Sequence, residues 1–165
     1  RIGADTFIRV GTSGLMQPDR MTSGDLVVVT GAVRDEGTAS HYMPLAFPAV
    51  ANLDVVTCLR DACQALDVGY HVGFSHSKDS FYAEMEPERM PLADELQKRW
   101  KAWVMGGVLC SEMEAAALYV LCSVLGKRAG GLMVAIKDTE PEIEVVCKTA
   151  VEGVRRLIAL DATSA

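Results

Sequence analysis

Apolar residues follow two patterns along this chain, one typical of strands and one typical of helices, and the two patterns alternate. Short runs rich in β-branched residues predict strands at Thr6–Val10, Asp25–Val33, Val68–Phe74, Val108–Cys110 and Arg128–Ile136. Apolar residues three or four positions apart predict helices at Asn52–Leu66, Leu92–Val104, Met113–Leu125 and Ile143–Leu160. This alternation is typical of an α/β domain of three-layer type, in which helices flank a central mixed β-sheet.

The segments between these elements are predicted to be irregular. Pro44 and Pro48 break up the stretch Leu45–Val50, which we expect to be a loop. The polar run Ser75–Asp79 is expected to end the strand before it, and the Glu-rich stretch Phe81–Met90 to be irregular around its proline.

Length and composition predict one folded domain over residues 1–165, of which 50% are hydrophobic and 23% charged. The chain enters its first strand without an initiator Met, so we expect it to lack an N-terminal part of that domain. No apolar run reaches the ~18–20 residues of a membrane span. A net charge of −6 argues against binding to a nucleic-acid backbone. Any anionic ligand must therefore be held locally, by a few arginines or by helix N-termini.

The cysteines and histidines do not form a recognisable metal motif. Five cysteines are scattered through apolar segments without a CxxC pair, which indicates buried thiols in a reducing, cytoplasmic setting. His71 and His76 are separated by an odd number of positions on a predicted strand, so their side chains should lie on opposite faces. We expect no bound metal.

Two carboxylates, Glu112 and Glu114, stand at the start of the predicted helix Met113–Leu125, which is otherwise apolar enough to be largely buried. A buried carboxylate without a partner costs several kcal/mol. One explanation is that the positive helix N-terminus stabilises both groups. The other is that one carboxylate caps the helix while the second faces a polyhydroxylated ligand.

Three further strand ends carry polar residues suited to ligand binding. The segment Arg9–Gly14 combines a guanidinium, two hydroxyls and two glycines, a composition that suits phosphate but also suits a simple turn. Phe81 and Tyr82 offer flat rings that stack on a base or form local core. The segment 137–139 is either a ligand site or a solvated strand end.

Several motifs resemble, in the same order, those of uridine phosphorylases, members of the nucleoside phosphorylase family that also holds the hexameric purine nucleoside phosphorylases. The motifs are Phe7-Ile8-Arg9-Val10-Gly11-Thr12-Ser13-Gly14, Gln17-Pro18, Gly24-Asp25, Ser40-His41-Tyr42, Phe47-Pro48-Ala49-Val50, Asp79-Ser80-Phe81-Tyr82 and Glu112-Met113-Glu114. They span nearly the whole chain, and the Phe-Pro-Ala-Val segment favours a resemblance to the uridine phosphorylases within this family.

The resemblance implies phosphorolysis of uridine to uracil and ribose 1-phosphate. It implies that Arg9 and Thr12 bind phosphate and that Thr12 also lies near the ribose. It also implies that Arg9 and Glu114 are the catalytic residues. It also implies that Met113 and Glu114 hold the ribose, with Glu112 in the same motif. A carboxylate on the sugar hydroxyls and an oriented phosphate both stabilise an oxocarbenium-like sugar. Inorganic phosphate is then a co-substrate, no cofactor is needed, and the protein is a homo-oligomer, a dimer or hexamer.

The base site departs from the uridine phosphorylase pattern. The resemblance implies that Gly14 and Phe81 border the base, but the Gln that reads uracil is absent, and Glu84 stands nearest its position. Arg89 is the candidate for the Arg that follows that Gln. Asp138 stands where purine-specific relatives place a proton donor. A purine or broad-specificity phosphorylase, or a relative that binds nucleosides without cleaving them, therefore stays open.

Overall fold

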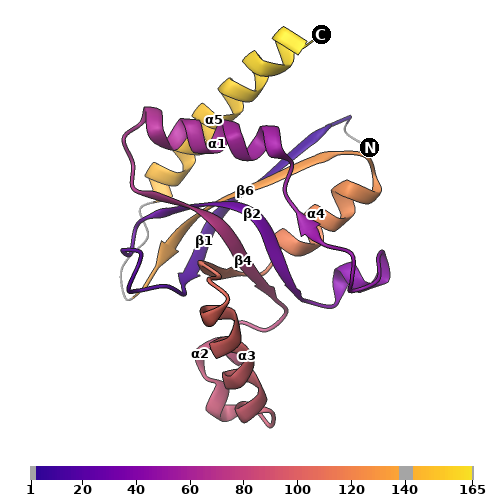
Figure 1. Cartoon of the computed structure of the whole chain (residues 1–165), viewed down its shortest axis with the longest axis vertical. Coiled ribbons are helices and arrows are strands. Elements are labelled where there is room, and N and C mark those ends of the chain that lie inside the picture. The colour runs from indigo at the N-terminus through magenta and orange to yellow at the C-terminus, as the bar shows by residue number, and fades with distance from the viewer. Residues whose placement is uncertain (1–2, 138–142, 165) are drawn as a thin grey trace.

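The computed structural model describes residues 3–137 and 143–164, in which strands and helices alternate (Figure 1). The strands are β1 (Thr6–Leu15), β2 (Leu26–Asp35), β3 (Ala49–Val50), β4 (Tyr70–Lys78), β5 (Cys110–Glu112) and β6 (Arg128–Ile136). The α-helices are α1 (Leu53–Ala65), α2 (Tyr82–Met85), α3 (Ala93–Met105), α4 (Ala115–Val124) and α5 (Ile143–Ser164). Two 3-10 helices, η1 (Thr38–His41) and η2 (Pro87–Arg89), complete the set.

The strands form one mixed sheet in the order β3-β2-β4-β5-β1-β6. Strand β2 also pairs with β6, so the sheet curls round and closes on itself. The β1–β6, β2–β4 and β4–β5 pairs are parallel, and the β1–β5, β2–β3 and β2–β6 pairs are antiparallel. This confirms the predicted α/β fold with a mixed central sheet.

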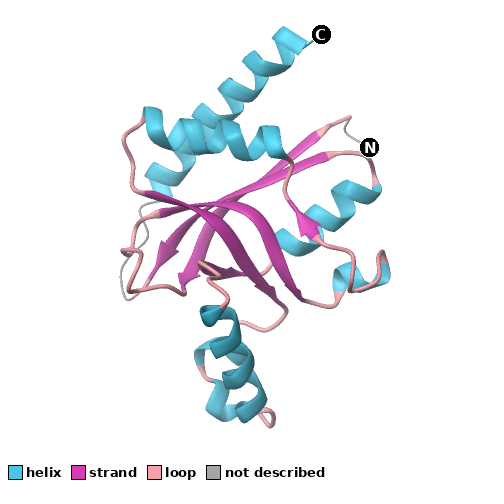
Figure 2. Ribbon diagram, in the orientation of Figure 1, coloured by secondary structure: helices cyan, strands magenta, loops and turns pink. Residues whose placement is uncertain are grey.

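Helices cover the sheet on several sides. In the view of Figure 2, α1 and α5 lie together above the strands, α4 lies to the right, and the short α2 and α3 project below. The centre of the core is formed by apolar residues of β2 and β6, of which Leu26, Val27, Val28 and Val29 and Leu132, Met133, Val134 and Ala135 are fully shielded from solvent. Helix α1 begins where Asn52 accepts hydrogen bonds from the backbone N–H groups of Asp54 and Val55.

Strand β5 brings three elements together where the candidate site forms. Gly14 of β1 lies opposite Ser111 in the antiparallel β1–β5 pair. On the other side of β5, His76 and Ser77 of β4 lie beside Ser111 and Glu112. Because side chains alternate along strands, Glu112 and Ser111 project from opposite faces of β5.

Two predicted strand ends were wrong. The segment Gly11–Gly14 continues β1, and Ser75–Lys78 continues β4 instead of ending it. The Ser75–Lys78 side chains are polar yet buried, since each one hydrogen-bonds to a residue of the neighbouring strand β5. Polar composition alone indicated a loop because those partners are remote in sequence.

Smaller differences concern element ends. Ala49–Val50 pairs with β2 as the short β3 and is not loop, while Phe81–Met90 contains α2 and η2 and is not wholly irregular. The strand predicted at Val108–Cys110 is displaced to Cys110–Glu112. Helix α4 begins at Ala115, after the predicted Met113, because Glu112 accepts from the backbone N–H groups of the first turn.

Candidate functional site

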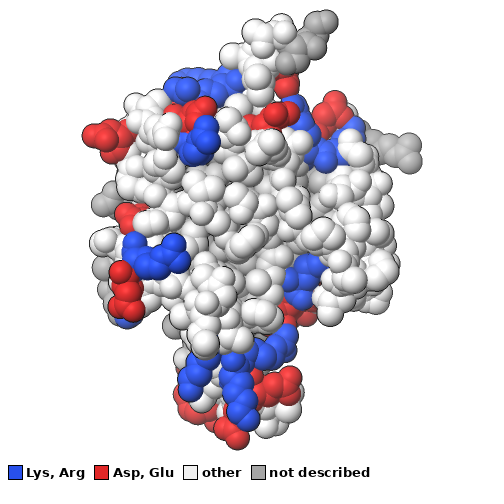
Figure 3. Space-filling view, viewed as in Figure 1, with Lys and Arg blue, Asp and Glu red and all other residues white. Residues whose placement is uncertain are grey.

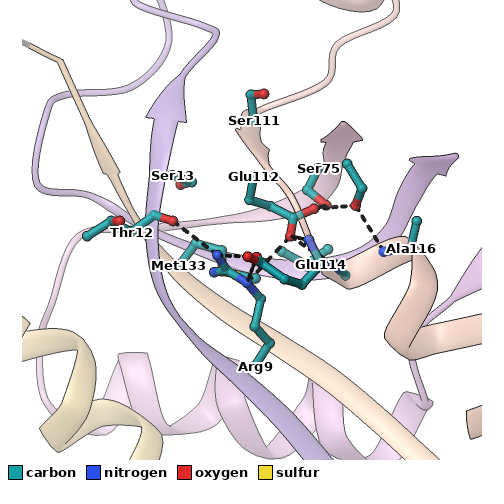
Figure 4. A network of polar contacts seen from close by, with 12 residues as sticks. Arg9, Thr12, Ser13, Ser75, Ser111, Glu112, Glu114, Ala116 and Met133 are labelled. Carbon is teal, nitrogen blue, oxygen red and sulfur yellow. Dashed lines mark hydrogen bonds and ion pairs between the residues drawn. The ribbon is translucent and has the colours of Figure 1, made fainter. Parts of the chain in front are cut away.

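The N-terminus of α4 is capped by a buried carboxylate from the preceding strand. Glu112 Oε2 accepts hydrogen bonds from the backbone N–H groups of Glu114 and Ala115, both at 2.8 Å. Its Oε1 accepts from the hydroxyls of Ser75 and Ser77, and the Ser77 hydroxyl in turn accepts from the N–H of Ala116 at 2.9 Å (Figure 4). The carboxylate of Glu112 is therefore occupied by the protein's own donors.

Glu114, two residues further on, is placed differently. Its side chain is 58% exposed, and its Oε2 accepts from Arg9 Nε at 2.6 Å and lies 2.6 Å from a second Arg9 nitrogen. Arg9 itself is 18% exposed and also lies 3.5 Å from Glu112 Oε2. Of the two carboxylates, one thus caps the helix and the other is accessible beside a guanidinium.

The guanidinium of Arg9 is held in one orientation from several directions. One terminal nitrogen donates to the sulfur of Met133, and the other lies 3.5 Å from the carbonyl oxygen of Thr12 (Figure 4). Gly11 makes room for it, because a Cβ at Gly11 would lie 3.1 Å from an Arg9 nitrogen. A fixed fork of N–H donors next to an accessible carboxylate suits a ligand that carries both an anionic group and hydroxyls.

A second polar network lies on the opposite face of β5, around Ser111. Lys78 Nζ donates to Ser111 Oγ at 2.7 Å and pairs with Glu84 Oε2 at 2.5 Å. Ser111 Oγ donates to the same Glu84 oxygen at 2.5 Å, and His76 Nδ1 lies 3.3 Å from Ser111 Oγ. Strand β5 thus carries one polar network on each face.

His76 connects this network to a cavity. Its Nε2 lies 2.9 Å from Asp35 Oδ2, and burial, with the nearby Lys78 ammonium, lowers the pKa of His76 to about 4. The adjoining cavity of about 460 Å³ lies between the end of β4 and helix α3 and is lined by Trp100, Trp103, Glu84 and Lys78, among others. The imidazole is therefore neutral near pH 7 at the cavity wall.

The structure brings together some of the residues predicted for the site. Arg9, Glu114 and the backbone of Thr12 meet, and Met113 lies between the two carboxylates of its motif, partly exposed. Gly14 lies beside Glu84, since a Cβ at Gly14 would approach Glu84 Oε1 to 2.9 Å. A substrate contact of Glu112 stays a prediction, one that its cap geometry does not favour.

Other predicted residues lie apart from this group. Phe81 is exposed with its ring edge against Tyr82, and Arg89 is exposed and paired with Glu86. No hydrogen bond or ion pair links Phe81 or Arg89 to the Arg9–Glu114 pair within residues 3–137 and 143–164. Asp138 lies outside the described residues. The roles predicted for all three remain predictions.

Sequence reasoning missed the side chains that hold the site residues in place. Ser75, Ser77 and Lys78 were assigned to a loop, although their alternation along a strand places the two serines on one face and Lys78 on the other. That two-residue period, continuing straight from the apolar run Val68–Phe74, was the available signal.

Comparison with known proteins places this site in a family. A model of the phosphorylase superfamily matches residues 1–164. The chain belongs to this superfamily. The match spans Arg9, Thr12 and Glu114 alike, so the two polar networks around β5 are part of a phosphorylase superfamily domain.

The relatives of this chain include proteins named uridine phosphorylase and guanosine phosphorylase. Uridine phosphorylase of Treponema pallidum is 42% identical over 97% of this chain and 66% of its own length. Uridine phosphorylase of Thermococcus kodakarensis is 41% identical over 78% of this chain and 47% of its own. Guanosine phosphorylase of Halorubrum lacusprofundi is 39% identical over 80% of this chain and 50% of its own. The chain spans between about half and two thirds of the length of these relatives.

The described part of the chain contains neither a cluster of metal-ligating side chains nor a membrane-spanning helix. Residues 3–137 and 143–164 contain no group of three or more His, Cys, Asp or Glu side chains placed to share a metal ion. Every helix in these ranges is too short or too polar to span a bilayer.

Proposed function

We propose that this superfamily member cleaves the N-glycosidic bond of uridine with inorganic phosphate, releasing uracil and ribose 1-phosphate. The observation that carries the proposal is the contact between Arg9 and Glu114, a guanidinium and an accessible carboxylate 2.6 Å apart. The names of relatives at 41–42% identity support uridine as the substrate. Phosphate and nucleoside are thus the proposed partners, and no cofactor is required beyond them.

The proposed mechanism follows from the two charges. As the bond to the base breaks, the sugar gains positive charge, and a carboxylate that accepts hydrogen bonds from its hydroxyls stabilises that charge. Arg9 binds phosphate through N–H donors that do not bond Glu114 and orients it toward the anomeric carbon. Because Arg9 also neutralises Glu114, the pair keeps both groups fixed before substrate binds.

An absorbance assay tests the activity directly. The purified protein is incubated with uridine, thymidine, inosine or adenosine, each with and without phosphate, and release of the free base is followed. The proposal predicts phosphate-dependent release of uracil. Release of hypoxanthine but not uracil would overturn the substrate assignment. Nucleoside binding in calorimetry without cleavage would identify a non-catalytic relative.

A purine nucleoside is the second candidate substrate. The relative named guanosine phosphorylase, at 39% identity, favours it, as does the presence of Glu84 near the position of the missing Gln. Inosine in the same assay separates this candidate from the first.

We also propose a homo-oligomer located in the cytoplasm. Figure 3 shows a broad uncharged area over β2 and β4, and the exposed apolar side chains Val50, Val72 and Phe74 belong to the neighbouring strands β3 and β4. An apolar area of this kind favours contact with another protein surface. Free buried thiols at Cys58, Cys63, Cys110 and Cys122 suit a reducing compartment. Light scattering on the purified protein tests the assembly, and a monomer at micromolar concentration would contradict it.

A further inference from the structure

Arg9 and Met133 lie at diagonal corners of a small square of residues on two neighbouring strands. In the parallel pairing of β1 with β6, Arg9 is opposite Gly131, and Gly11 is opposite Met133. Residues two positions apart on a strand share a face of the sheet, and so do residues that lie opposite each other on adjacent strands. The four residues are therefore on one face, and each long side chain has a glycine as its neighbour across the strands.

The two glycines give the long side chains room to meet. A Cβ at Gly11 would lie 3.1 Å from Nη1 of Arg9. A Cβ at Gly131 would likewise lie 3.1 Å from Met133 Cε. In the space left free, Nη1 of Arg9 donates a hydrogen bond to the sulfur of Met133 (Figure 4). Met133 is fully buried, so this acceptor is fixed by the packing of the core.

The contact with Met133 leaves Arg9 with one terminal N–H of fixed direction. Nε and Nη2 of Arg9 both lie 2.6 Å from Glu114 Oε2, and Nη2 also lies 3.5 Å from the carbonyl oxygen of Thr12. A terminal guanidinium nitrogen carries two N–H groups. Nη1 uses one of them on Met133, and within residues 3–137 and 143–164 no acceptor bonds the other. Because the guanidinium is planar, fixing the first N–H also fixes the second.

We propose that Met133 is a positioning residue for phosphate and acts through Arg9. The proposal rests on the proposed function. A thioether sulfur is a weak acceptor, so it directs Nη1 without competing strongly with a phosphate oxygen. A carboxylate in the same place would neutralise the guanidinium and bind the N–H groups that phosphate needs. Met133 thus keeps one N–H of Arg9 oriented and available before phosphate binds.

The substitution Met133→Leu tests this role, because it removes the acceptor and nearly keeps the volume of the side chain. The KM for phosphate is expected to rise about three- to tenfold, the range for one lost hydrogen bond. The KM for uridine at saturating phosphate is expected to stay unchanged. Met21→Leu is the matched control, since Met21 is a buried methionine of the same core. A phosphate KM that rises no more in Met133→Leu than in Met21→Leu would overturn the proposal.

A double-mutant cycle separates an effect through Arg9 from a general loss of structure. The phosphate KM is compared among the unmodified protein, Met133→Leu, Arg9→Lys and the variant that carries both changes. Because Met133 acts on the guanidinium, Met133→Leu is expected to cause no further rise once Arg9 is replaced. A structural role would raise the phosphate KM by the same factor in both backgrounds, and that result would contradict the proposal.

The contact itself is tested by nuclear magnetic resonance without any turnover. With isotope-labelled methionine methyl groups, the Met133 signal is the one that disappears in Met133→Leu. Arg9→Lys is expected to shift this signal. Arg60→Lys, which changes an exposed arginine paired with Asp61, is expected to leave it in place. A Met133 signal that does not move in Arg9→Lys would overturn the proposal even if uridine is cleaved.

Failure of the proposed function is recognised separately. If no nucleoside is cleaved at all, the proposed function fails, and inorganic phosphate is titrated while the Met133 signal is observed. A shift in the unmodified protein that is absent from Arg9→Lys would support the role of Met133 in holding an anion site. No shift at saturating phosphate would overturn that role on its own.

Discussion

Replacing Glu112 with alanine is expected to destabilise the fold more than any other change at the site. The substitution removes the acceptor for the backbone N–H groups of Glu114 and Ala115, which lie 2.8 Å from Oε2. It also removes the acceptor for the hydroxyls of Ser75 and Ser77. The two backbone donors at the start of α4 are fixed by the helix and cannot turn to another acceptor.

The size of the effect follows from these lost bonds. A lost helix cap costs about 1–2 kcal/mol, and each buried donor left unpaired costs about 1–3 kcal/mol. Since cap and donor terms overlap, we expect a loss of roughly 3–5 kcal/mol in the free energy of unfolding. For a domain of this size that corresponds to a fall of roughly 10 °C in Tm.

Urea unfolding followed by circular dichroism measures this loss, and Glu114→Ala is the matched control. Glu114 is 58% exposed and does not cap the helix, so its removal is expected to change the free energy of unfolding by less than about 1 kcal/mol. If Glu112→Ala were no less stable than Glu114→Ala, the division of the two carboxylates into cap and ligand group would be refuted.

Three further changes test other parts of the structure. Arg9→Lys is expected to raise the KM for phosphate about tenfold or more, because an ammonium lacks the planar fork of the guanidinium; steady-state kinetics with an unchanged phosphate KM would argue against it. His76 has a folded-state pKa of about 4, below the 6.5 of the unfolded chain, so the unfolded state takes up the proton first as the pH falls from 6.5 to 4. Stability should therefore fall over that range, by about 3 kcal/mol at most, and His76→Asn should flatten the pH dependence of urea unfolding; an equal slope in both proteins would contradict this. Gly130→Ala would place a Cβ in steric overlap with Val55 Cγ1, so we expect a loss of about 1–3 kcal/mol in the free energy of unfolding, and an unchanged Tm would contradict the tight packing of α1 on β6.

The sequence predicted the elements that rest on local pattern. Arg128–Ile136 was predicted with the bounds of β6 because its apolar residues form one continuous run. The start of α1 was predicted within one residue, because the apolar residues that follow Asn52 recur at helical spacing. Both features depend only on residues close together in the chain.

Features that depend on remote partners were not predicted. The polar run Ser75–Lys78 belongs to a strand only because Ser111 and Glu112, more than thirty positions away, satisfy its side chains. One of the two explanations offered for the motif Glu112-Met113-Glu114 was that one carboxylate caps the helix while the other faces a ligand. The fold shows that Glu112 is the cap and Glu114 the exposed carboxylate, because it brings Arg9 beside Glu114. No local sequence pattern contains the position of Arg9.

Turnover of uridine by Glu114→Ala is the most direct test of the central claim, that the exposed carboxylate beside Arg9 holds the sugar while its base departs. The measurement is the rate of phosphate-dependent uracil release at saturating phosphate, with folding confirmed by an unchanged urea midpoint. The account predicts a fall in kcat/KM of at least ~100-fold, the range seen when a group that stabilises transition-state charge is removed. Activity within a few-fold of the unmodified protein would contradict it.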